Sequence, residues 1–338
     1  MLRLAYLQIF VLFCFVNEVV FAQDIHFSQF ANSPLNLNPA QTGLFNGDYR
    51  IMANQRSQWS AVPIPYSTFS LGADMRNPIR LKNQTTGAGL VLNSDKAGDS
   101  DMRITQAISS FSWLKKLTPD SSHILSIGIQ TGVTNKSFNT SKLTFDSQYN
   151  GDTYDASMAS NEAFAKSQIT YLDFGAGLNY VFRIKERMSF SIGTSFFHLN
   201  TPKQSFMQNS DVKLGRKMAI NTSCQFKIAE KMDMIISSIL STQGKYKEIV
   251  AGTAFKYIID TADNINAYLG NYYRVGDADI IIVGLDYKNM YAGLSYDINL
   301  SSLKIATNGR GGFELSFIYI LQKFVPIRAR KTLCPIYM

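Results

Sequence analysis

Hydrophobic and polar residues alternate with a period of two along most of the chain, and the stretch Thr170–Phe182 is a clear instance. One set of alternate positions is apolar and ends in aromatic residues, whereas the other is mostly small or polar. The apolar face is formed by Leu172, Phe174, Ala176, Leu178, Tyr180 and Phe182, and the other face by Tyr171, Asp173, Gly175, Gly177, Asn179 and Val181. A strand of about 10 residues whose apolar face is closed by aromatics is what a tilted transmembrane strand requires. The stretch therefore predicts a strand with one face in lipid.

The same alternation recurs from Tyr49 to Leu321 and predicts about 14 strands. We expect them at Tyr49–Gln58, Tyr66–Met75, Thr86–Asn93, Met102–Trp113, Ile124–Val133, Thr170–Phe182, Ser189–Leu199, Lys217–Phe226, Met232–Leu240, Ile249–Ile258, Asn266–Tyr273, Asp279–Tyr287, Met290–Asn299 and Phe313–Leu321. Because lipid offers no partners to backbone N–H and C=O groups, a spanning sheet has to close on itself. The predicted fold class is all-β: an antiparallel up-and-down transmembrane β-barrel of the bacterial outer membrane.

The connections between the predicted strands alternate in length. The long ones are Asn135–Gln168, Asn200–Arg216 and Leu300–Gly312, and the short ones include Arg183–Met188, Lys227–Lys231 and Lys288–Asn289. Long extracellular loops and short periplasmic turns are typical of transmembrane barrels, whereas a soluble sandwich or propeller has no reason to sort its loops in this way. The strand Thr170–Phe182 then runs from the longest external loop toward the periplasm. Asp173 is expected inside the barrel near the outer rim, and Phe182 at the periplasmic interface.

The first residues predict an export signal, because Arg3 precedes an apolar run over Leu4–Phe15 and Ala22 ends the segment. Cys14 suggests a lipoprotein as an alternative, but Phe13 stands where a small residue is expected, which argues against lipidation. After the signal, an Asn- and Pro-rich stretch has no clean period. The chain is thus divided into a cleaved signal peptide (1–22), an irregular periplasmic amino-terminal segment (23–48), a transmembrane β-barrel (49–321) and a periplasmic carboxy-terminal tail (322–338).

Composition agrees with a barrel that has one face in lipid. The chain contains 23 Phe and 17 Tyr, only 17% of its residues are charged, and no apolar run after the signal approaches the length of a spanning helix. The formal net charge of +8 comes from basic residues scattered through turns, such as Lys115 and Arg187. Solvated turns near lipid headgroups explain this charge better than an acidic partner does. Nucleic acid is excluded as a partner because no dense basic run accompanies a recognition motif.

Candidate chemistry is sparse. His26, His123 and His198 show no metal-ligand spacing, and His198 with a nearby serine is the sole arrangement that suggests a hydrolase. The acidic stretch Asp152–Glu162 does not match a calcium loop. Cys224 and Cys334 remain after signal cleavage, and their pairing is left open. We predict a non-enzymatic protein without a cofactor or metal.

Charged residues on the polar strand faces predict a charge-paired lumen. They are Arg50, Arg56, Asp74, Asp173 and Glu314. Such a lumen either conducts solute or holds a polar network that fills and braces the barrel, and a barrel of about 14 strands is compatible with both.

Several short motifs occur in a characteristic order. They are Phe27-Ser28-Gln29-Phe30, Asn38-Pro39-Ala40, Arg56-x-Gln58-Trp59, Asp95-Lys96-Ala97-Gly98, Asp146-x-Gln148-Tyr149, His198-Leu199-Asn200-x-Pro202, Ser295-Tyr296-Asp297 and Cys334-Pro335. In this order they resemble the PorP/SprF family of outer-membrane proteins of the type IX secretion and gliding-motility machinery of Bacteroidota. The chain departs from the family where Ser94 separates Asn93 from Asp95, and where Ile336-Tyr337-Met338 replaces the usual Arg-Phe ending.

The resemblance implies a barrel that supports export, surface attachment or display of large secreted proteins such as adhesins. Its implied partners are periplasmic or outer-membrane components of the secretion machine, a secreted substrate's carboxy-terminal signal domain, and outer-membrane lipid. The family motifs supply the candidate partner-binding positions Phe27, Gln29, Phe30, Asn38, Pro39, Arg56, Trp59, Asp95, Lys96, Gly98, His198, Asn200, Pro202, Tyr296, Asp297, Cys334 and Pro335. The alternative interpretation is an outer-membrane porin or solute channel, motivated by the polar lumen face.

Overall fold

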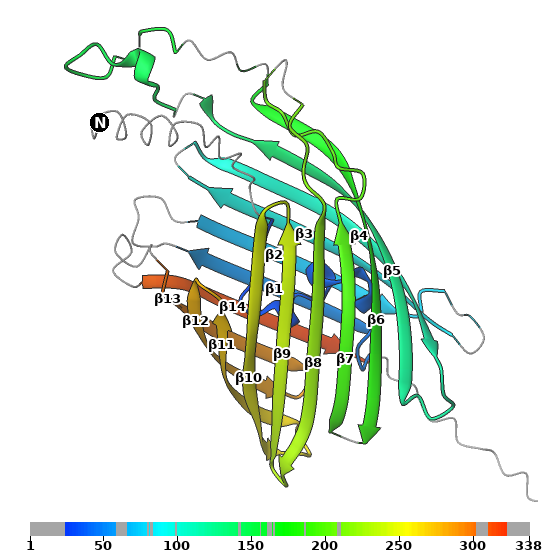
Figure 1. The fold of residues 1–338 in the computed structure, drawn as a ribbon. Helices are drawn as coiled ribbons and strands as arrows, with labels where there is room; N and C mark the ends of the chain where they lie inside the picture. The colour runs from blue at the N-terminus through cyan, green and yellow to red at the C-terminus, as the bar shows by residue number, and fades with distance from the viewer. Residues whose placement is uncertain are drawn as a thin grey trace, which may run out of the picture.

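Fourteen antiparallel strands form a closed barrel in the computed structural model (Figure 1). The structure describes residues 24–58, 66–79, 81, 84–98, 100–140, 143–155, 157–160, 164, 166–185, 187–207, 211–301 and 310–322. The strands are β1 (Tyr49–Gln58), β2 (Tyr66–Arg76), β3 (Thr85–Ala97), β4 (Met102–Lys116), β5 (His123–Ser137), β6 (Gln168–Lys185), β7 (Met188–Phe197), β8 (Lys217–Ala229), β9 (Met232–Gln243), β10 (Tyr246–Asp260), β11 (Ile265–Arg274), β12 (Ala278–Tyr287), β13 (Met290–Asn299) and β14 (Arg310–Leu321).

Each strand pairs with the next strand in the sequence, and β1 closes the barrel by pairing with β14 in the register Tyr49↔Leu321. The predicted fold class and strand count are therefore confirmed. The predicted bounds of β1 and β13 match at both ends, whereas β5 and β6 are longer than predicted. Their extra residues lie where the alternation of apolar and polar positions fades, because a strand that leaves the bilayer has no lipid on either face.

The two ends of the barrel differ as the connection lengths predict. The strands β5, β7 and β13, which precede the three long connections, all end at the same end of the barrel, which we call the long-loop end. The other end, the short-turn end, carries tight connections such as 230–231 and 288–289, the start of β1 and the end of β14.

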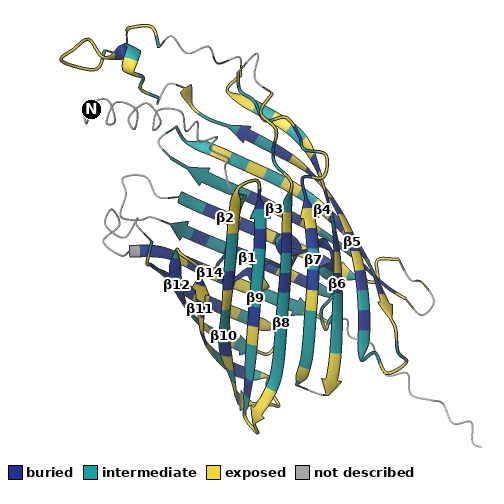
Figure 2. Ribbon diagram, in the orientation of Figure 1, coloured by how far each residue is buried: buried dark blue, intermediate teal, exposed yellow. Residues whose placement is uncertain are grey.

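Buried and exposed residues alternate along the strands (Figure 2), and the exposed ones are largely apolar whereas many of the buried ones are polar, as the alternation predicts. On β6, Leu172 and Phe174 point outward with 56% and 44% of their surface exposed, while Asp173 between them is buried at 7%. Serine and asparagine side chains such as Ser126 and Asn179 are buried on the inner face. Outward apolar side chains suit a lipid environment, and buried polar ones need partners inside the lumen.

Those partners come from the amino-terminal segment, whose described residues 24–48 lie inside the barrel. We expected this segment in the periplasm, outside the barrel, and the structure corrects that placement. It contains the short helical turns η1 (Phe30–Asn32), α2 (Pro34–Leu37) and η2 (Pro39–Gln41), visible behind the front strands in Figure 1. Irregular backbone is tolerated at membrane depth where protein surrounds it, so the lack of a periodic pattern did not exclude the lumen. We call residues 24–48 the plug.

Outside the plug, the described residues include the helical turn η4 (Asp146–Gln148), which lies in the β5–β6 connection. Among the described residues, no helix has the length and hydropathy needed to cross a bilayer. The signal peptide expected at 1–22 and nearly all of the tail expected at 322–338 lie outside the described residues.

Candidate functional site

The plug runs through the lumen from the long-loop end to the short-turn end. At its first described residue, the backbone N–H of Asp24 donates to Oε1 of Gln243 at 3.3 Å, where β9 ends at the long-loop end. At its other end, the N–H of Asp48 donates to the carbonyl of Leu321 at 2.9 Å, directly before β1 begins. The plug therefore spans the barrel from one end to the other.

Asn38 and Pro39 fix the middle of the plug to the wall. The Asn38 side-chain amide donates to the carbonyl oxygens of Leu178 on β6 and Thr194 on β7, at 3.0 and 3.2 Å. Its Oδ1 accepts from the N–H of Ala40 at 2.9 Å and so caps η2, where Pro39 occupies the first turn. Asn38 is fully buried. The Asn-Pro-Ala motif thus closes a helical turn and links it to two strands.

Glycines in the wall make room for this turn. A Cβ atom added to Gly177 on β6 would lie closer than 3.0 Å to Oδ1 of Asn38, and one added to Gly128 on β5 would lie closer than 3.0 Å to the backbone of Pro39 and Ala40. Real Cβ atoms do not tolerate such distances. These glycines are therefore required by the close approach of the plug backbone.

A buried carboxylate receives the backbone of the Phe-Ser-Gln-Phe motif. Both oxygens of Glu314 on β14 accept hydrogen bonds, from the N–H of Ser28 at 2.7 Å and from the N–H of Gln29 at 3.0 Å. The Gln29 side chain donates in turn to Ser295 Oγ and to the carbonyl of Glu314, both at 3.2 Å. Glu314 is only 1% exposed, so these bonds replace its lost hydration.

Two arginines surround the same part of the plug. Arg56 on β1 donates to the carbonyl of His26 at 2.7 Å and to Asp297 on β13 at 2.9 Å. Arg274 on β11 donates to Asp297 at 3.0 Å and to Ser28 Oγ at 2.8 Å. We call Arg56, Arg274, Asp297 and Glu314 the arginine cluster. It brings together charged side chains from four strands and anchors the plug between them.

A second anchor lies at the short-turn end. Arg50 donates two hydrogen bonds to the Asp74 carboxylate, at 2.9 and 2.7 Å. Asp74 also accepts a hydrogen bond from the backbone N–H of Gly43 at 2.8 Å. The Arg50 guanidinium lies 4.6 Å from the ring centre of Phe45. The predicted pairing of charges across the lumen face is confirmed, and here it holds the end of the plug.

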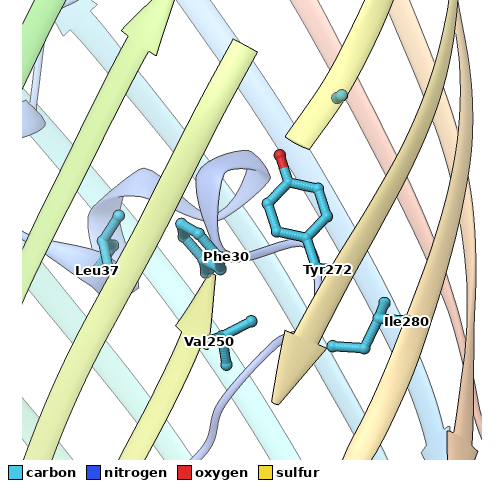
Figure 3. Close-up of a cluster of buried hydrophobic side chains, with 6 residues drawn as sticks. Phe30, Leu37, Val250, Tyr272 and Ile280 are labelled. Carbon is cyan, nitrogen blue, oxygen red and sulfur yellow. The ribbon is translucent and has the colours of Figure 1, made fainter. Parts of the chain in front are cut away.

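Apolar plug side chains pack against the wall between the two anchors. Figure 3 shows Phe30 and Leu37 beside Val250, Tyr272 and Ile280, which belong to β10, β11 and β12. The rings of Phe30 and Tyr272 meet edge to face, with 6.1 Å between their centres. This burial gives the plug a small hydrophobic core of its own inside a polar lumen.

The amino-terminal end of the plug is held by a histidine between two carboxylates. Nε2 of His198 lies 2.5 Å from Asp24 in the plug, and Nδ1 lies 2.7 Å from Asp173 on β6. Lys217 is a further cation 3.8 Å from Asp24. Since both ring nitrogens face carboxylates, neither is available to take a proton from a serine. The arrangement is an ionic latch, and we call Asp24, His198 and Asp173 the latch.

The latch stabilises the charged imidazole. Burial opposes the charge of His198, but Asp24 and Asp173 outweigh burial and hold the pKa of His198 above its ordinary value. Burial likewise opposes ionisation of Asp24, but His198 and Lys217 outweigh it and hold the pKa of Asp24 below its usual range. His198 follows β7 and Asp24 belongs to the plug, so both lie outside the spanning strands.

We expect the stability of the plugged barrel to depend on pH through the latch. The contribution of His198 is complete below its unfolded-state pKa of about 6.5 and is lost as pH rises through the raised pKa of the folded state. The contribution of Asp24 is complete above about pH 4 and is lost on acidification. Between pH 5.5 and pH 10, the wild type should therefore lose about 1.5–3 kcal/mol more unfolding free energy than His198→Gln. Urea titrations would measure this, with the folded fraction taken from the gel band of the unboiled barrel, which shifts on boiling in detergent. Equal pH dependence in the two proteins would contradict it.

The Asp95-Lys96-Ala97-Gly98 motif forms the β3–β4 turn at the long-loop end. Oδ1 of Asp95 accepts from Thr68 at 2.5 Å, and Lys96 pairs with Asp101 at 2.7 Å. Gly98 has a φ of 68°, a conformation that favours glycine. These bonds and the φ of Gly98 shape the turn.

The remaining described candidates shape the wall. The Asn200 side chain donates to the carbonyl of Leu172 at 2.7 Å, and the carbonyl of Pro202 accepts from the N–H of Leu214 at 2.9 Å, so the β7–β8 connection folds back over β6. Tyr296 points outward and is 42% exposed. Trp59, Cys334 and Pro335 lie outside the described residues, and so does a Cys224–Cys334 pairing.

Among the residues that hold the plug, Arg274 and Asp24 were not identified as site residues from the sequence. Arg274 shares the inner face of β11 with Tyr272 and Gly270, so a charge at that position in the alternation could have identified it. Asp24 lies in a stretch without a period, and no pattern indicated its contact with His198. Among the described residues, no group of three His, Cys, Asp or Glu side chains is placed to hold a metal ion.

The plug leaves an open mouth and a filled interior. A cavity of about 600 Å³ lies at the long-loop end between the residues Asp24–His26 and strand ends that carry Tyr66, Glu248 and Asp277. Deeper in the lumen, the space around Phe30 is about 40 Å³, which is room for about three water molecules. The lumen thus holds a chamber at its mouth, and the plug packs against the wall below it.

Comparison with known proteins gives a family and a fold. Residues 19–319 match the family described as type IX secretion system membrane protein PorP/SprF. No curated protein matches the chain. Among solved structures, the TodX monoaromatic hydrocarbon channel deltaS2 mutant is similar with a TM-score of 0.51, 9% identity, and coverage of 87% of this chain and 94% of that one. A Pseudomonas aeruginosa FadL homologue is similar with a TM-score of 0.51, 11% identity, and coverage of 83% and 92%.

Proposed function

Because the chain belongs to the PorP/SprF family of type IX secretion system membrane proteins, we propose that it is a non-enzymatic barrel that supports export, attachment or display of large secreted proteins. The family and the barrel place it in the outer membrane as a component of a secretion system with protein partners. A carboxy-terminal signal domain of a secreted substrate and periplasmic parts of the machine are the partners that we propose.

The observation that carries this proposal is the plug. A lumen filled by residues 24–48 and braced by the arginine cluster and the latch is suited to rigidity. Solute flow would require displacing a segment whose Asn38 and Thr42 are fully buried. A braced barrel with long connections at one end offers a stable platform for protein contacts, since binding residues are commonly carried on loops held by a rigid scaffold.

We expect a strain that lacks this protein to lose the surface display of at least one large secreted protein. The reason is that a component of the machine, and not a general porin, is removed. Surface proteolysis followed by mass spectrometry of intact cells would measure display, with complementation by the wild-type chain as the control. Unchanged display in the deletion strain, together with purification of the native protein as a lone barrel, would refute the proposal.

The alternative function, a porin or solute channel, is favoured by the charged lumen face and the chamber of about 600 Å³ at its mouth. A channel would show steady conductance when the purified protein is placed in planar bilayers. We expect no steady conductance, because the plug occupies the lumen below the chamber. Steady conductance of the unmodified protein would support the channel and contradict the plug's proposed role.

A further inference from the structure

The β5–β6 hairpin projects beyond the barrel at the long-loop end. The strands β5 and β6 contain 15 and 18 residues, whereas the neighbouring β7 contains 10. The ladder between β6 and β7 begins at Ala176, so residues 168–175 extend past the end of β7 (Figure 1). About 9–11 residues suffice to cross a bilayer, and the remainder of this hairpin therefore stands outside the membrane.

A phenylalanine cluster joins the β5–β6 and β7–β8 connections. The ring of Phe138 lies 5.2 Å from that of Phe164 and 4.7 Å from that of Phe206, and Phe145 lies 6.1 Å from Phe164. The backbone N–H of Lys166 also donates to the carbonyl of Phe206 at 3.3 Å. The two longest connections thus pack together beyond the barrel.

The Asp-x-Gln-Tyr motif organises the end of this extension. The buried Gln148 side chain accepts from the N–H of Phe145 at 3.3 Å and donates to the carbonyl of Met158 at 3.0 Å. The carbonyl of Gln148 accepts from the N–H of Asp155 at 2.8 Å. We call the described residues 143–155 and 157–160 the tip. Its internal bonds hold its shape before any partner arrives, which lowers the entropy lost on binding.

The tip presents large apolar side chains to solvent. Tyr149 and Tyr154 face each other across a β-bridge and are 56% and 46% exposed, and Met158 is 39% exposed. These side chains belong to the residue types that are enriched in the cores of protein interfaces. Lipid does not explain their exposure, because they lie on the extramembrane part of the hairpin.

The tip is acidic in a basic protein. It carries Asp146, Asp152 and Asp155 and contains no lysine or arginine, whereas the whole chain has a formal net charge of +8. Hydrogen bonds from Ser157 hold the pKa of Asp155 below its usual range, so the carboxylate is ionised at neutral pH. A binding partner is therefore expected to be basic at the contact.

We propose that the tip is the docking surface for a secreted protein with a basic contact surface. On the tip, Tyr149 and Tyr154 supply the apolar contact, and Asp146 and Asp152 supply the negative charge. This inference rests on the proposed function and names the surface that carries it. Phosphate-bearing lipid headgroups would be repelled by the carboxylates. A symmetric contact between two copies of this chain would bring two acidic tips together and would also be repelled.

Display of secreted proteins by cells that carry tip variants tests the proposal. We expect Tyr149→Ala/Tyr154→Ala to reduce display at least tenfold, because truncated tyrosine contacts at an interface centre have large effects. Asp146→Asn/Asp152→Asn should reduce display a few fold at low salt and less at high salt, since salt screens exposed charges. The matched control is Tyr246→Ala, which removes a 37%-exposed tyrosine at the start of β10. The gel band of the unboiled barrel, which shifts on boiling, would verify that every variant is folded.

A photo-reactive phenylalanine analogue at position 154 identifies the contact in intact cells. We expect an adduct with a secreted protein that is absent when the analogue stands at position 246. Adducts with lipid only, or with a second copy of the chain, would overturn the proposal, and so would wild-type display by the tyrosine variant. Normal display in the deletion strain would refute the proposed function itself, whereas loss in the deletion strain with normal display by the tip variants refutes the docking surface alone.

Discussion

Replacing Arg56 by methionine should destabilise the folded barrel by about 3–5 kcal/mol, because a buried ion pair broken on one side leaves a charge without its partner. Arg56 is 1% exposed, and its guanidinium contacts Asp297 at 2.9 Å and the carbonyl of His26 at 2.7 Å. Without it, Asp297 still contacts Arg274, but the arginine cluster is left with two buried carboxylates, Asp297 and Glu314, and one arginine. Loss of Arg56 therefore removes a contact within the wall and a contact between the wall and the plug.

Urea titration in detergent would measure this loss, with the folded fraction taken from the gel band of the unboiled barrel. The control is Lys96→Met, which removes an exposed pair with Asp101 and should change stability by about 0–1 kcal/mol. The double variant Arg56→Met/Asp297→Asn should be less destabilised than the sum of the two single variants, since the charge left behind is also removed. Equal effects at Arg56 and Lys96 would show that the arginine cluster does not brace the barrel.

Substituting Gly128 by alanine should displace the plug from the wall. The new Cβ atom would lie closer than 3.0 Å to backbone atoms of Pro39 and Ala40, which cannot rotate away as a side-chain end can. Overpacking of this kind is unfavourable by about 1–3 kcal/mol. A change of that size raises the population of the undocked plug by about 5- to 150-fold. Conductance in planar bilayers and cleavage by chymotrypsin after plug phenylalanines should both increase.

The control for Gly128→Ala is Gly215→Ala. The nearest atom to a Cβ at Gly215 lies at 3.8 Å, which is an ordinary contact, so this variant should behave as the wild type. If Gly128→Ala remained silent and resistant to chymotrypsin, the plug would have to be held more loosely than its contacts indicate. If conductance and chymotrypsin cleavage increased in both Gly128→Ala and Gly215→Ala, the cause would be a general loosening of the barrel and not the contact with Pro39.

Much of the candidate site followed from the alternation of residues, and some of it did not. The inward placement of Arg50, Arg56, Asp74, Asp173 and Glu314 is confirmed, because a strand sends alternate side chains to opposite faces whatever their partners are. The Phe-Ser-Gln-Phe and Asn-Pro-Ala motifs were recognised only as a family resemblance. Their contacts are with the barrel wall itself, so a search for exposed binding positions would not have found their role.

The sequence by itself determined the barrel: its strands, the facing of its side chains and the sorting of its connections. These features depend on local periodicity and on the requirement that a sheet in lipid closes. Only the tertiary structure decided where residues 24–48 lie and which groups hold them. The plug is held by many hydrogen bonds to the wall. The backbone N–H of Ser28, for example, donates to Glu314 at a separation of 286 positions, and no local pattern records a partner so distant.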